Sequence, residues 1–326
     1  MEGPFRLPAE SGGEKMTNIE KLAAILAVVQ TDPGNRGLAR DPVDNLFTAT
    51  AGDFERACRS IANEMAPVIF LVTGFIIPSV DPPRFETDGP LGAVFLARAF
   101  FHLGIAVLPL TDFGAFHAIE TGVSLGGIPK ENIVRNNPHD DALWGSWIKS
   151  FDTGLCPQIH CIALERVGPT SDGRCYTMRG TDITDLILPA HHCFTRNDGE
   201  LLQWKTIGIG DGGNEIGMGK ISHETIVKNI PNGDLIHCRV PTDHLIVAGV
   251  SNWGAYALAA GIFVLRGVKP PAELFDPDRE LAILEAMVRA GPLVDGVTGQ
   301  QTATVDGLSW DEYSRPLIAI QRILES

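Results

Sequence analysis

The residues best suited to chemistry lie in a glycine-rich stretch, residues 207–220, which reads IGIGDGGNEIGMGK. It places Asp211, Asn214, Glu215 and Lys220 among six glycines. Glycine weakens helices and strands and is kept where the backbone must turn sharply or approach a ligand closely. The preceding residues, 206–209, are predicted to form a strand. The sequence therefore places side-chain oxygens and an ammonium group in a loop at the end of a strand, where a ligand can bind.

Polar residues follow four other predicted strands in the same way. Open α/β sheets bind ligands beyond the carboxyl ends of their strands, so these residues are expected to meet at one edge. Glu86 and Asp88 join them from a loop before a predicted helix with Pro90 at its favoured first position. The strand-end residues are Thr73 and Gly74, Thr111 and Asp112, Glu165 and Arg166, and Ser251 and Asn252.

Carboxylates crowded at one edge repel each other unless they are protonated or neutralised. A hard divalent cation with oxygen ligands, Mg²⁺, Mn²⁺ or Ca²⁺, is the natural neutraliser. Each acid also has a simpler explanation: Asp88 or Asp112 could cap a helix, and Glu165 could pair with Arg166 or Arg179. The combination favours a metal site with Asp88, Asp112, Glu165, Asp211 and Glu215 as predicted ligands and Glu86 as a further candidate.

Two other site types fit the sequence less well. Gly208, Gly210 and Gly213 match the spacing of a dinucleotide-binding loop. However, Asp211 lies where a pyrophosphate would approach and would repel it, so no NAD is expected. The run His191-His192-Cys193 has no second ligand pair at a spacing suited to zinc.

Composition limits the function further. The chain has 326 residues, 44% of them hydrophobic, and a net charge of −14, which argues against nucleic-acid binding. Its apolar runs are too short to span a bilayer, and its six cysteines form no CxxC pair. We expect a cytoplasmic protein with reduced thiols, no membrane partner, a homo-oligomeric state and a small-molecule substrate.

Alternating strand and helix patterns predict an α/β fold with a largely parallel or mixed central sheet and helices on both faces. Residues 1–16 are expected to be a disordered arm, residues 17–326 a single domain, and residues 168–199 a polar excursion or lid. Strands are predicted at 68–72, 105–110, 133–135, 158–164, 206–209, 235–238 and 245–248. Helices are predicted at 18–30, 53–65, 90–103, 113–121, 140–151, 223–230, 255–265, 272–290 and 316–324.

Five motifs resemble the D-glutamate cyclase family, in particular the C-terminal domain of the mitochondrial vertebrate enzyme. They are FLVTGF at 70–75, ETDGPLGA at 86–93, YTMRGTDI at 176–183, GDGGNEIGMGK at 210–220 and AGVSNWGAYAL at 248–258. The resemblance extends over roughly residues 40–300 and matches stand-alone prokaryotic members. The vertebrate enzyme carries an additional N-terminal domain.

This resemblance implies closure of D-glutamate to 5-oxo-D-proline with loss of water, assisted by the cation. A metal-dependent phosphoesterase and a non-catalytic cation-binding protein remain as alternatives, because both also need acids at strand ends. The predicted catalytic residues are Glu86, Asp88, Asn214 and Glu215. The predicted substrate-binding residues are Thr73, Gly74, Arg179, Lys220, Ser251 and Asn252.

Overall fold

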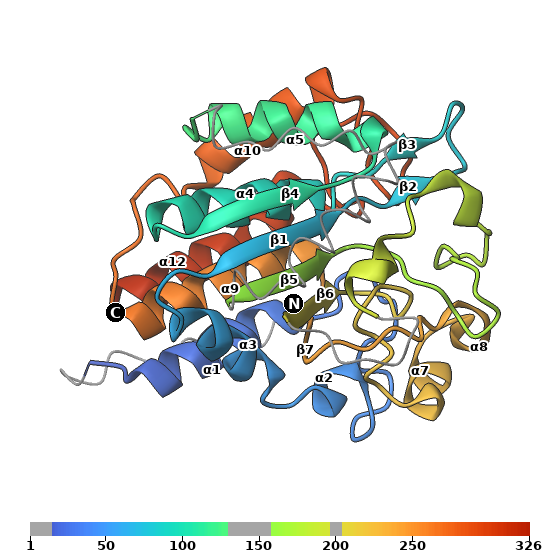
Figure 1. The fold of residues 1–326 in the computed structure, drawn as a ribbon, viewed down its shortest axis with the longest axis horizontal. Helices are drawn as coiled ribbons and strands as arrows, with labels where there is room; N and C mark the ends of the chain where they lie inside the picture. The colour runs from blue at the N-terminus through green and yellow to red at the C-terminus, as the bar shows by residue number, and fades with distance from the viewer. Residues whose placement is uncertain (1–14, 130–157, 196–203) are drawn as a thin grey trace.

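A five-stranded parallel sheet forms the centre of the fold. The computed structural model describes residues 15–129, 158–195 and 204–326 (Figure 1). Neighbouring strands of this sheet all run parallel, in the order β4-β1-β5-β6-β7. This confirms the predicted α/β fold. The strands are β1 (Val68–Thr73), β4 (Ala106–Leu110), β5 (Ile159–Leu164), β6 (Lys205–Gly210) and β7 (His244–Val247).

The direction in which strands are added changes after β4. The chain places β4 on one side of β1 and then adds β5, β6 and β7 in succession on the other side. At such a switch point, the loops that leave the two adjacent strands diverge and open a crevice beyond the strand ends. Here the switch lies between β1 and β5, where Thr73 pairs with Leu164. A ligand is therefore expected to bind beyond these two residues.

Long helices cover one face of the sheet. α4 (Pro90–His102) and α9 (Ser251–Arg266) pack on each other and on the strands, and nearly all their side chains are buried. Gly92 permits this close approach, because a Cβ there would lie 2.7 Å from Asn252 Oδ1. Around α9 lie α1 (Asn18–Val29), α3 (Asp53–Ala62) and α12 (Arg315–Glu325).

The opposite face is covered, in the described residues, by short helices and loops. Phe70, Cys161 and Val247 belong to a second buried cluster that includes side chains from these elements. Helices therefore lie on both faces, as predicted, but the two layers are unequal. The covering elements are α2 (Leu46–Ala49), α7 (His223–Asn229), α8 (Gly233–Ile236) and the 3₁₀ turn η3 (Ala190–Cys193).

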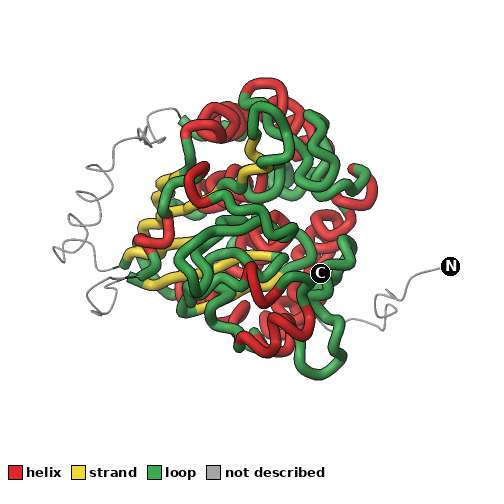
Figure 2. The backbone as a smooth tube through the Cα atoms, turned by 90° about the vertical axis from the view of Figure 1, so that its right-hand side faces the viewer, coloured by secondary structure: helices red, strands yellow, loops and turns green. Residues whose placement is uncertain are grey.

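The remaining elements extend the helical layer and the carboxyl edge of the sheet. α5 (Phe113–Leu125) and α10 (Pro277–Ala290) pack together beside α4, at the top of Figure 1. A small antiparallel pair, β2 (Ile76–Ile77) and β3 (Arg84–Phe85), follows β1. Figure 2 shows the molecule from the right-hand side of Figure 1, where β2, β3 and the loops beyond the sheet lie. A 3₁₀ turn, η2 (Thr184–Leu186), and a short helix, α11 (Trp310–Tyr313), complete the described elements.

Most predicted elements are confirmed, and two kinds of difference stand out. The strand predicted at 235–238 is wrong, because α8 occupies Gly233–Ile236 and leaves β7 as the next strand. The helix predicted from 255 begins four residues earlier, at Ser251, and the one predicted from 272 begins at Pro277, where Asp276 caps it. The strand at 133–135 and the helix at 140–151 lie outside the described residues, as do 1–14 of the predicted arm.

Over its described part, residues 168–195, the polar excursion contains only η2, η3 and an isolated bridge between Tyr176 and Asp182. None of the helices in the described residues is long and apolar enough to cross a membrane.

Candidate active site

Two helix starts and one strand end form the floor of the site. Asp88 precedes α4, yet its carboxylate accepts hydrogen bonds from the backbone N–H groups of Ser251 and Asn252, at 2.9 and 2.8 Å, at the start of α9. In return, Asn252 Oδ1 accepts from Gly89 N and Gly92 N, at 2.9 and 2.7 Å, at the start of α4. Each residue thus caps the other helix. The capping role predicted for Asp88 is real but serves the neighbouring helix, whereas the side chain of Asp112 makes no capping hydrogen bond at the start of α5.

Glu165 lies directly beyond β5, in a left-handed conformation with φ of 44°. Its backbone N–H donates to Ile209 O of β6 at 3.1 Å, which continues the sheet contact for one more residue. Ser251 Oγ donates to Glu165 Oε2 at 2.6 Å. This hydroxyl fixes one carboxylate oxygen, while the residue itself lines a pocket.

The glycine-rich loop is held by its own glutamate. Glu215 Oε1 accepts from Asp211 N at 2.8 Å and Oε2 accepts from Gly213 N at 2.7 Å. Asn214 Nδ2 donates to Tyr176 O at 2.8 Å and so ties the polar excursion to this loop. The glycines permit this tight turn, and the turn directs Asp211 into the pocket.

Sequence reasoning missed two residues of the site, Arg36 and Asp306. Arg36 Nη1 lies 2.8 Å from Asp211 Oδ2, and Nη2 lies 2.9 Å from Asp306 Oδ1. The backbone of the Arg36 loop is fixed by Asp32, which accepts N–H bonds from residues 36–38. Neither residue follows a strand of the central sheet, so the strand-end argument did not reach them. The turn pair Asp306-Gly307 was the only available signal.

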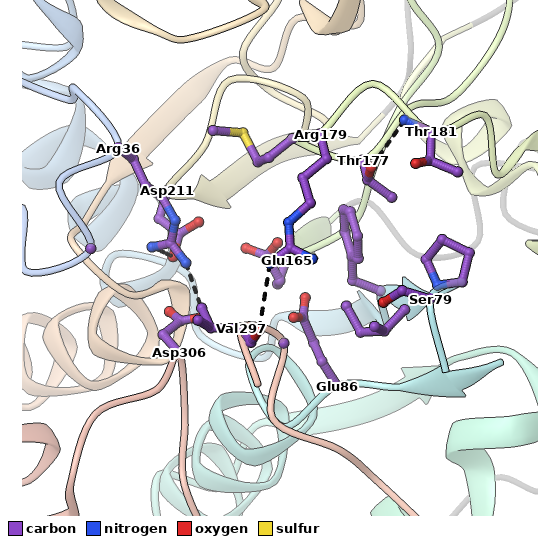
Figure 3. A pocket seen from close by; sticks show the side chains of 16 residues that line it. Arg36, Ser79, Glu86, Glu165, Thr177, Arg179, Thr181, Asp211, Val297 and Asp306 are labelled. Carbon is purple, nitrogen blue, oxygen red and sulfur yellow. Dashed lines mark hydrogen bonds and ion pairs between the residues drawn. The ribbon is translucent and has the colours of Figure 1, made fainter. Parts of the chain in front are cut away.

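These groups surround a pocket of about 320 Å³ at the switch point of the sheet. Glu86, Glu165, Asp211 and Asp306 bring carboxylates to its wall, and Arg179 lies across from them on the excursion (Figure 3). Arg179 Nη2 donates to Val297 O at 3.4 Å. The other lining residues are Gly34, Arg36, Phe75, Ile77, Pro78, Ser79, Thr177, Met178, Thr181, Gly296 and Val297.

Burial and mutual repulsion raise the pKa of several of these carboxyl groups. Burial, with the charge of Asp306 second, raises the pKa of Asp88 to about 7. Burial and neighbouring acids hold the pKa of Glu86 and of Glu165 well above the usual range. For Asp211, burial raises the pKa even against the opposing charge of Arg36. Full ionisation of these carboxyl groups is therefore unfavourable, and the site favours binding of a proton or a cation.

The donor set fits a hard divalent cation. Glu165, Asp211 and Glu215 each offer one carboxylate oxygen, and these oxygens all lie within 4.8 Å of one another. Asp88, Asp211 and Asp306 form a second such group. Oxygen ligands alone are what Mg²⁺, Mn²⁺ and Ca²⁺ prefer.

Two predicted site residues are engaged elsewhere. Asp112 forms a buried ion pair with Arg166, and both residues also bind the backbone of Leu188, which anchors the excursion. Asp112 belongs to neither oxygen group. Lys220 Nζ lies 2.6 Å from Asp53 Oδ2, and Lys220 does not line the pocket.

Thr73 and Gly74 lie at the end of β1, beneath the pocket, and do not line it. Thr73 Oγ1 is buried and has no hydrogen-bond partner among the described residues, and Gly74 O accepts from Arg166 at 2.9 Å. Gly74 has a φ of 115°, which glycine adopts without strain. These two residues shape the turn after β1 and support the residues that face the pocket.

Comparison with known proteins identifies the family of this chain. A family model described as D-glutamate cyclase-like, C-terminal, matches residues 25–321. The human protein named "D-glutamate cyclase, mitochondrial" is 32% identical over 270 residues, which is 80% of this chain but 41% of the human protein. The chain thus corresponds to less than half of that relative. The family match includes every residue that lines the pocket, and the chain belongs to the D-glutamate cyclase-like C-terminal family.

Proposed function

We propose that this protein closes D-glutamate to 5-oxo-D-proline with loss of water. The observation that carries the proposal is the pocket in which Glu86, Glu165 and Asp211 face Arg179. Carboxylates suit the substrate's ammonium group, and a guanidinium suits its α-carboxylate. Membership of the D-glutamate cyclase-like family supports the same reaction.

The reaction sets three requirements. The α-nitrogen must form a bond to the γ-carbon, and one C–O bond of the γ-carboxyl group must break. Two protons leave the ammonium group and end on the departing oxygen, which becomes water. The pocket must therefore fold the substrate, move protons from nitrogen to oxygen, and reduce the charge on the γ-carboxylate. Holding the two ends of the substrate together supplies a proximity effect that can reach several kcal/mol.

Two residues are suited to the substrate's polar groups. Arg179 is proposed to bind the α-carboxylate, because it lines the pocket and contacts no carboxylate among the described residues. Glu86 is proposed as the base that accepts a proton from the amine and returns it to the leaving oxygen. Its raised pKa makes it a stronger base than an ordinary glutamate. No side chain or backbone N–H among the described residues donates to its carboxyl group.

The other predicted residues are proposed to position these groups. Asp88 and Asn252 lock the starts of α4 and α9 together, and Ser251 holds Glu165. Asn214 holds the excursion that carries Arg179. The proposed cation ligands are Glu165, Asp211 and Glu215. A cation bound there supplies Lewis-acid polarisation of the γ-carboxyl group.

The direct test incubates purified protein with D- or L-glutamate, with and without a chelator, followed by Mg²⁺ or Mn²⁺ readdition. We expect 5-oxoproline from D-glutamate, loss of the activity with chelator, and recovery with metal. Release of phosphate from generic phosphoesters, with no lactam, would instead favour the phosphoesterase. Cation binding without turnover of either substrate class would favour a binding protein.

Replacing Arg179 with methionine is expected to raise KM for D-glutamate by about 10- to 100-fold, because a charge-assisted hydrogen bond to the α-carboxylate is lost. The value of kcat should change much less, since this contact is made equally before and during ring closure. Arg174→Met on the same excursion is the matched control, because Arg174 is exposed and pairs with Asp182 away from the pocket lining. Equal KM effects in both variants would contradict the assignment of Arg179.

Replacing Gly296 with alanine is expected to displace Glu86. A Cβ at this position would lie 1.8 Å from Glu86 Oε2, so the carboxyl group must move. A shift of about 1 Å in a reacting group can lower the rate by about 100-fold. Gly34→Ala lines the same pocket but makes only ordinary contacts, 3.5 Å or longer, and should leave the rate of 5-oxoproline formation nearly unchanged. An unimpaired Gly296→Ala enzyme would remove Glu86 from the mechanism.

A further inference from the structure

The sequence Val-Asp-Gly occurs twice near the pocket, at residues 294–296 and 305–307. The two aspartates have different surroundings. Asp306 lines the pocket, whereas Asp295 is 0% exposed and does not line it. We propose that Asp295 is a positioning residue, which fixes the carboxyl group of Glu86 by holding the turn against which that group packs. This inference rests on the proposed function, because it takes Glu86 as the base.

The Asp295 carboxylate holds the turn 296–298 to a second turn. Oδ1 accepts from Val297 N at 3.0 Å and from Thr298 N at 2.8 Å, and Oδ2 accepts from Gly307 N in the second turn, at 2.8 Å. Burial opposes the charge of this carboxylate, but the N–H groups that bind it hold its pKa below the usual range. The residue is therefore ionised at neutral pH, and its hydrogen bonds are charge-assisted and stronger than neutral ones.

The turn 296–298 lies directly against the carboxyl group of Glu86. A Cβ on Gly296 would lie 1.8 Å from Glu86 Oε2 and 3.0 Å from its Cδ. The backbone of this glycine therefore limits where Oε2 can lie. If the turn is released from Asp295, the carboxyl group loses this support and can take other positions.

The residue before Asp295 fixes the backbone of the same glutamate. Val294 forms a parallel bridge with Glu86. Val294 N donates to Phe85 O, and Thr87 N donates to Val294 O, each at 2.9 Å. The strand contact thus holds the main chain of Glu86, and Asp295 extends this support to the side chain.

Arg179, proposed to bind the α-carboxylate, depends much less on Asp295. Its contact with the turn, from Nη2 to Val297 O, is long at 3.4 Å. The excursion that carries it is tied to the glycine-rich loop, where Asn214 Nδ2 donates to Tyr176 O at 2.8 Å. Loss of Asp295 should therefore lower kcat and change KM for D-glutamate little.

The test replaces Asp295 with alanine and with asparagine and measures 5-oxoproline formation from D-glutamate. Asp295→Ala removes all three hydrogen bonds and should lower kcat by about 100-fold, the effect of moving a reacting group by about 1 Å. Asp295→Asn keeps one acceptor oxygen in a side chain of the same size and should lower kcat by about tenfold. KM should change by less than about threefold in both variants.

Asp41→Ala is the matched control. Asp41 Oδ1 binds the backbone of a turn in the same way, accepting from Val43 N at 2.9 Å and from Asp44 N at 2.8 Å, but this turn does not line the pocket. The control should leave kcat unchanged. An Asp295→Ala enzyme with unchanged kcat overturns the inference, as does an equal decrease in kcat in Asp41→Ala.

A double variant separates positioning of Glu86 from general damage to the fold. Asp295→Ala and Gly296→Ala both act on the position of that carboxyl group, so the kcat of the double variant should be close to that of the slower single variant. Effects that multiply, to a loss on the order of 10⁴-fold, would show that the two residues act independently and would overturn the inference. Thermal unfolding identifies a variant that does not fold. If Asp295→Ala does not fold, an Asp295→Asn enzyme with unchanged kcat still contradicts the proposal.

Crystal structures of Asp295→Ala and Asp41→Ala test the positioning without the reaction. We expect the Glu86 carboxyl group to be displaced or to occupy several positions in the first variant and to be unmoved in the second. An unmoved carboxyl group in Asp295→Ala contradicts the inference. Failure of the unmodified protein to form 5-oxoproline would refute the proposed function alone, whereas an active enzyme whose rate does not respond to Asp295 would refute this inference alone.

Discussion

Replacing Asp211 with asparagine is expected to lower both metal affinity and 5-oxoproline formation by at least about 100-fold. Changes in groups that merely support a metal ligand already cost about 10- to 100-fold. Asp211 contributes an oxygen to both carboxylate groups, so its loss affects every proposed cation ligand set. Metal content by mass spectrometry and initial rates with D-glutamate measure the two effects.

The same substitution should not destabilise the metal-free protein. The pKa of Asp211 is raised in the folded state, chiefly by burial, so the folded protein disfavours its charged form. A carboxyl group with a raised pKa reduces stability as pH rises above its value in the unfolded chain. Asparagine removes this effect and can still accept a hydrogen bond from Arg36. We therefore expect an unchanged or higher Tm at neutral pH with EDTA. An active Asp211→Asn enzyme with normal metal content would place the reaction elsewhere.

Replacing Arg98 with methionine is expected to cause the largest loss of stability, about 3–5 kcal/mol, because it leaves a buried carboxylate without its counter-ion. Arg98 and Glu280 are 3% and 0% exposed and lie 2.5 Å apart between α4 and α10. Tyr256 donates its hydroxyl to the other oxygen of Glu280 at 3.2 Å. For a chain of this size the loss corresponds to a decrease in Tm on the order of 5–10 °C.

The Arg98 effect should depend on pH with a definite sign. Burial raises the pKa of Glu280, and Arg98 opposes this rise. Without Arg98 the folded state holds a proton on Glu280 more tightly than the unfolded chain does. Stability is then lost as pH rises through the raised pKa. The free energy of unfolding of the variant should therefore be closer to that of the unmodified protein at pH 5 than at pH 8.

Arg289→Met, on the helix α10 that carries Glu280, is the matched control for Arg98→Met. Arg289 is 70% exposed and lies 3.6 Å from Glu285. Such a surface pair contributes little to stability, so the substitution should change the free energy of unfolding by no more than about 0.5 kcal/mol. Similar losses in the Arg98 and Arg289 variants would show that the buried pair has no special role. Urea denaturation at each pH measures the free energy of unfolding.

Local sequence patterns predicted most of the fold. Short, mostly apolar runs followed by polar residues or glycine marked the parallel strands, since strands buried on both faces have little polar alternation. The helix predicted at 18–30 begins at Asn18 in the structure, where Thr17 and Glu20 form a complete capping box. The pattern failed at residues 235–238, where the run Leu-Ile-His-Cys is too short to distinguish a strand from a helical turn.

The site was partly predictable for the same reason. Glu86, Glu165 and Asp211 were found because strands, glycines and a helix start placed them at one sheet edge, and they line the pocket. Arg36 and Asp306 were not found, because each reaches the pocket from a loop far along the chain. Local patterns carry no information about such contacts, which form only when the whole chain packs.

The sequence by itself determined the α/β class and placed the site at the carboxyl edge of the sheet. It also showed that acidic residues outnumber basic ones there. These features follow from short-range periodicity and residue type. Only the tertiary structure decided which acids face the pocket. It paired Asp112 with Arg166 and Lys220 with Asp53, and it exchanged the caps of α4 and α9 between Asp88 and Asn252. A charged or polar side chain takes the partner that lies within a few ångströms after folding, and chain position alone does not specify that partner.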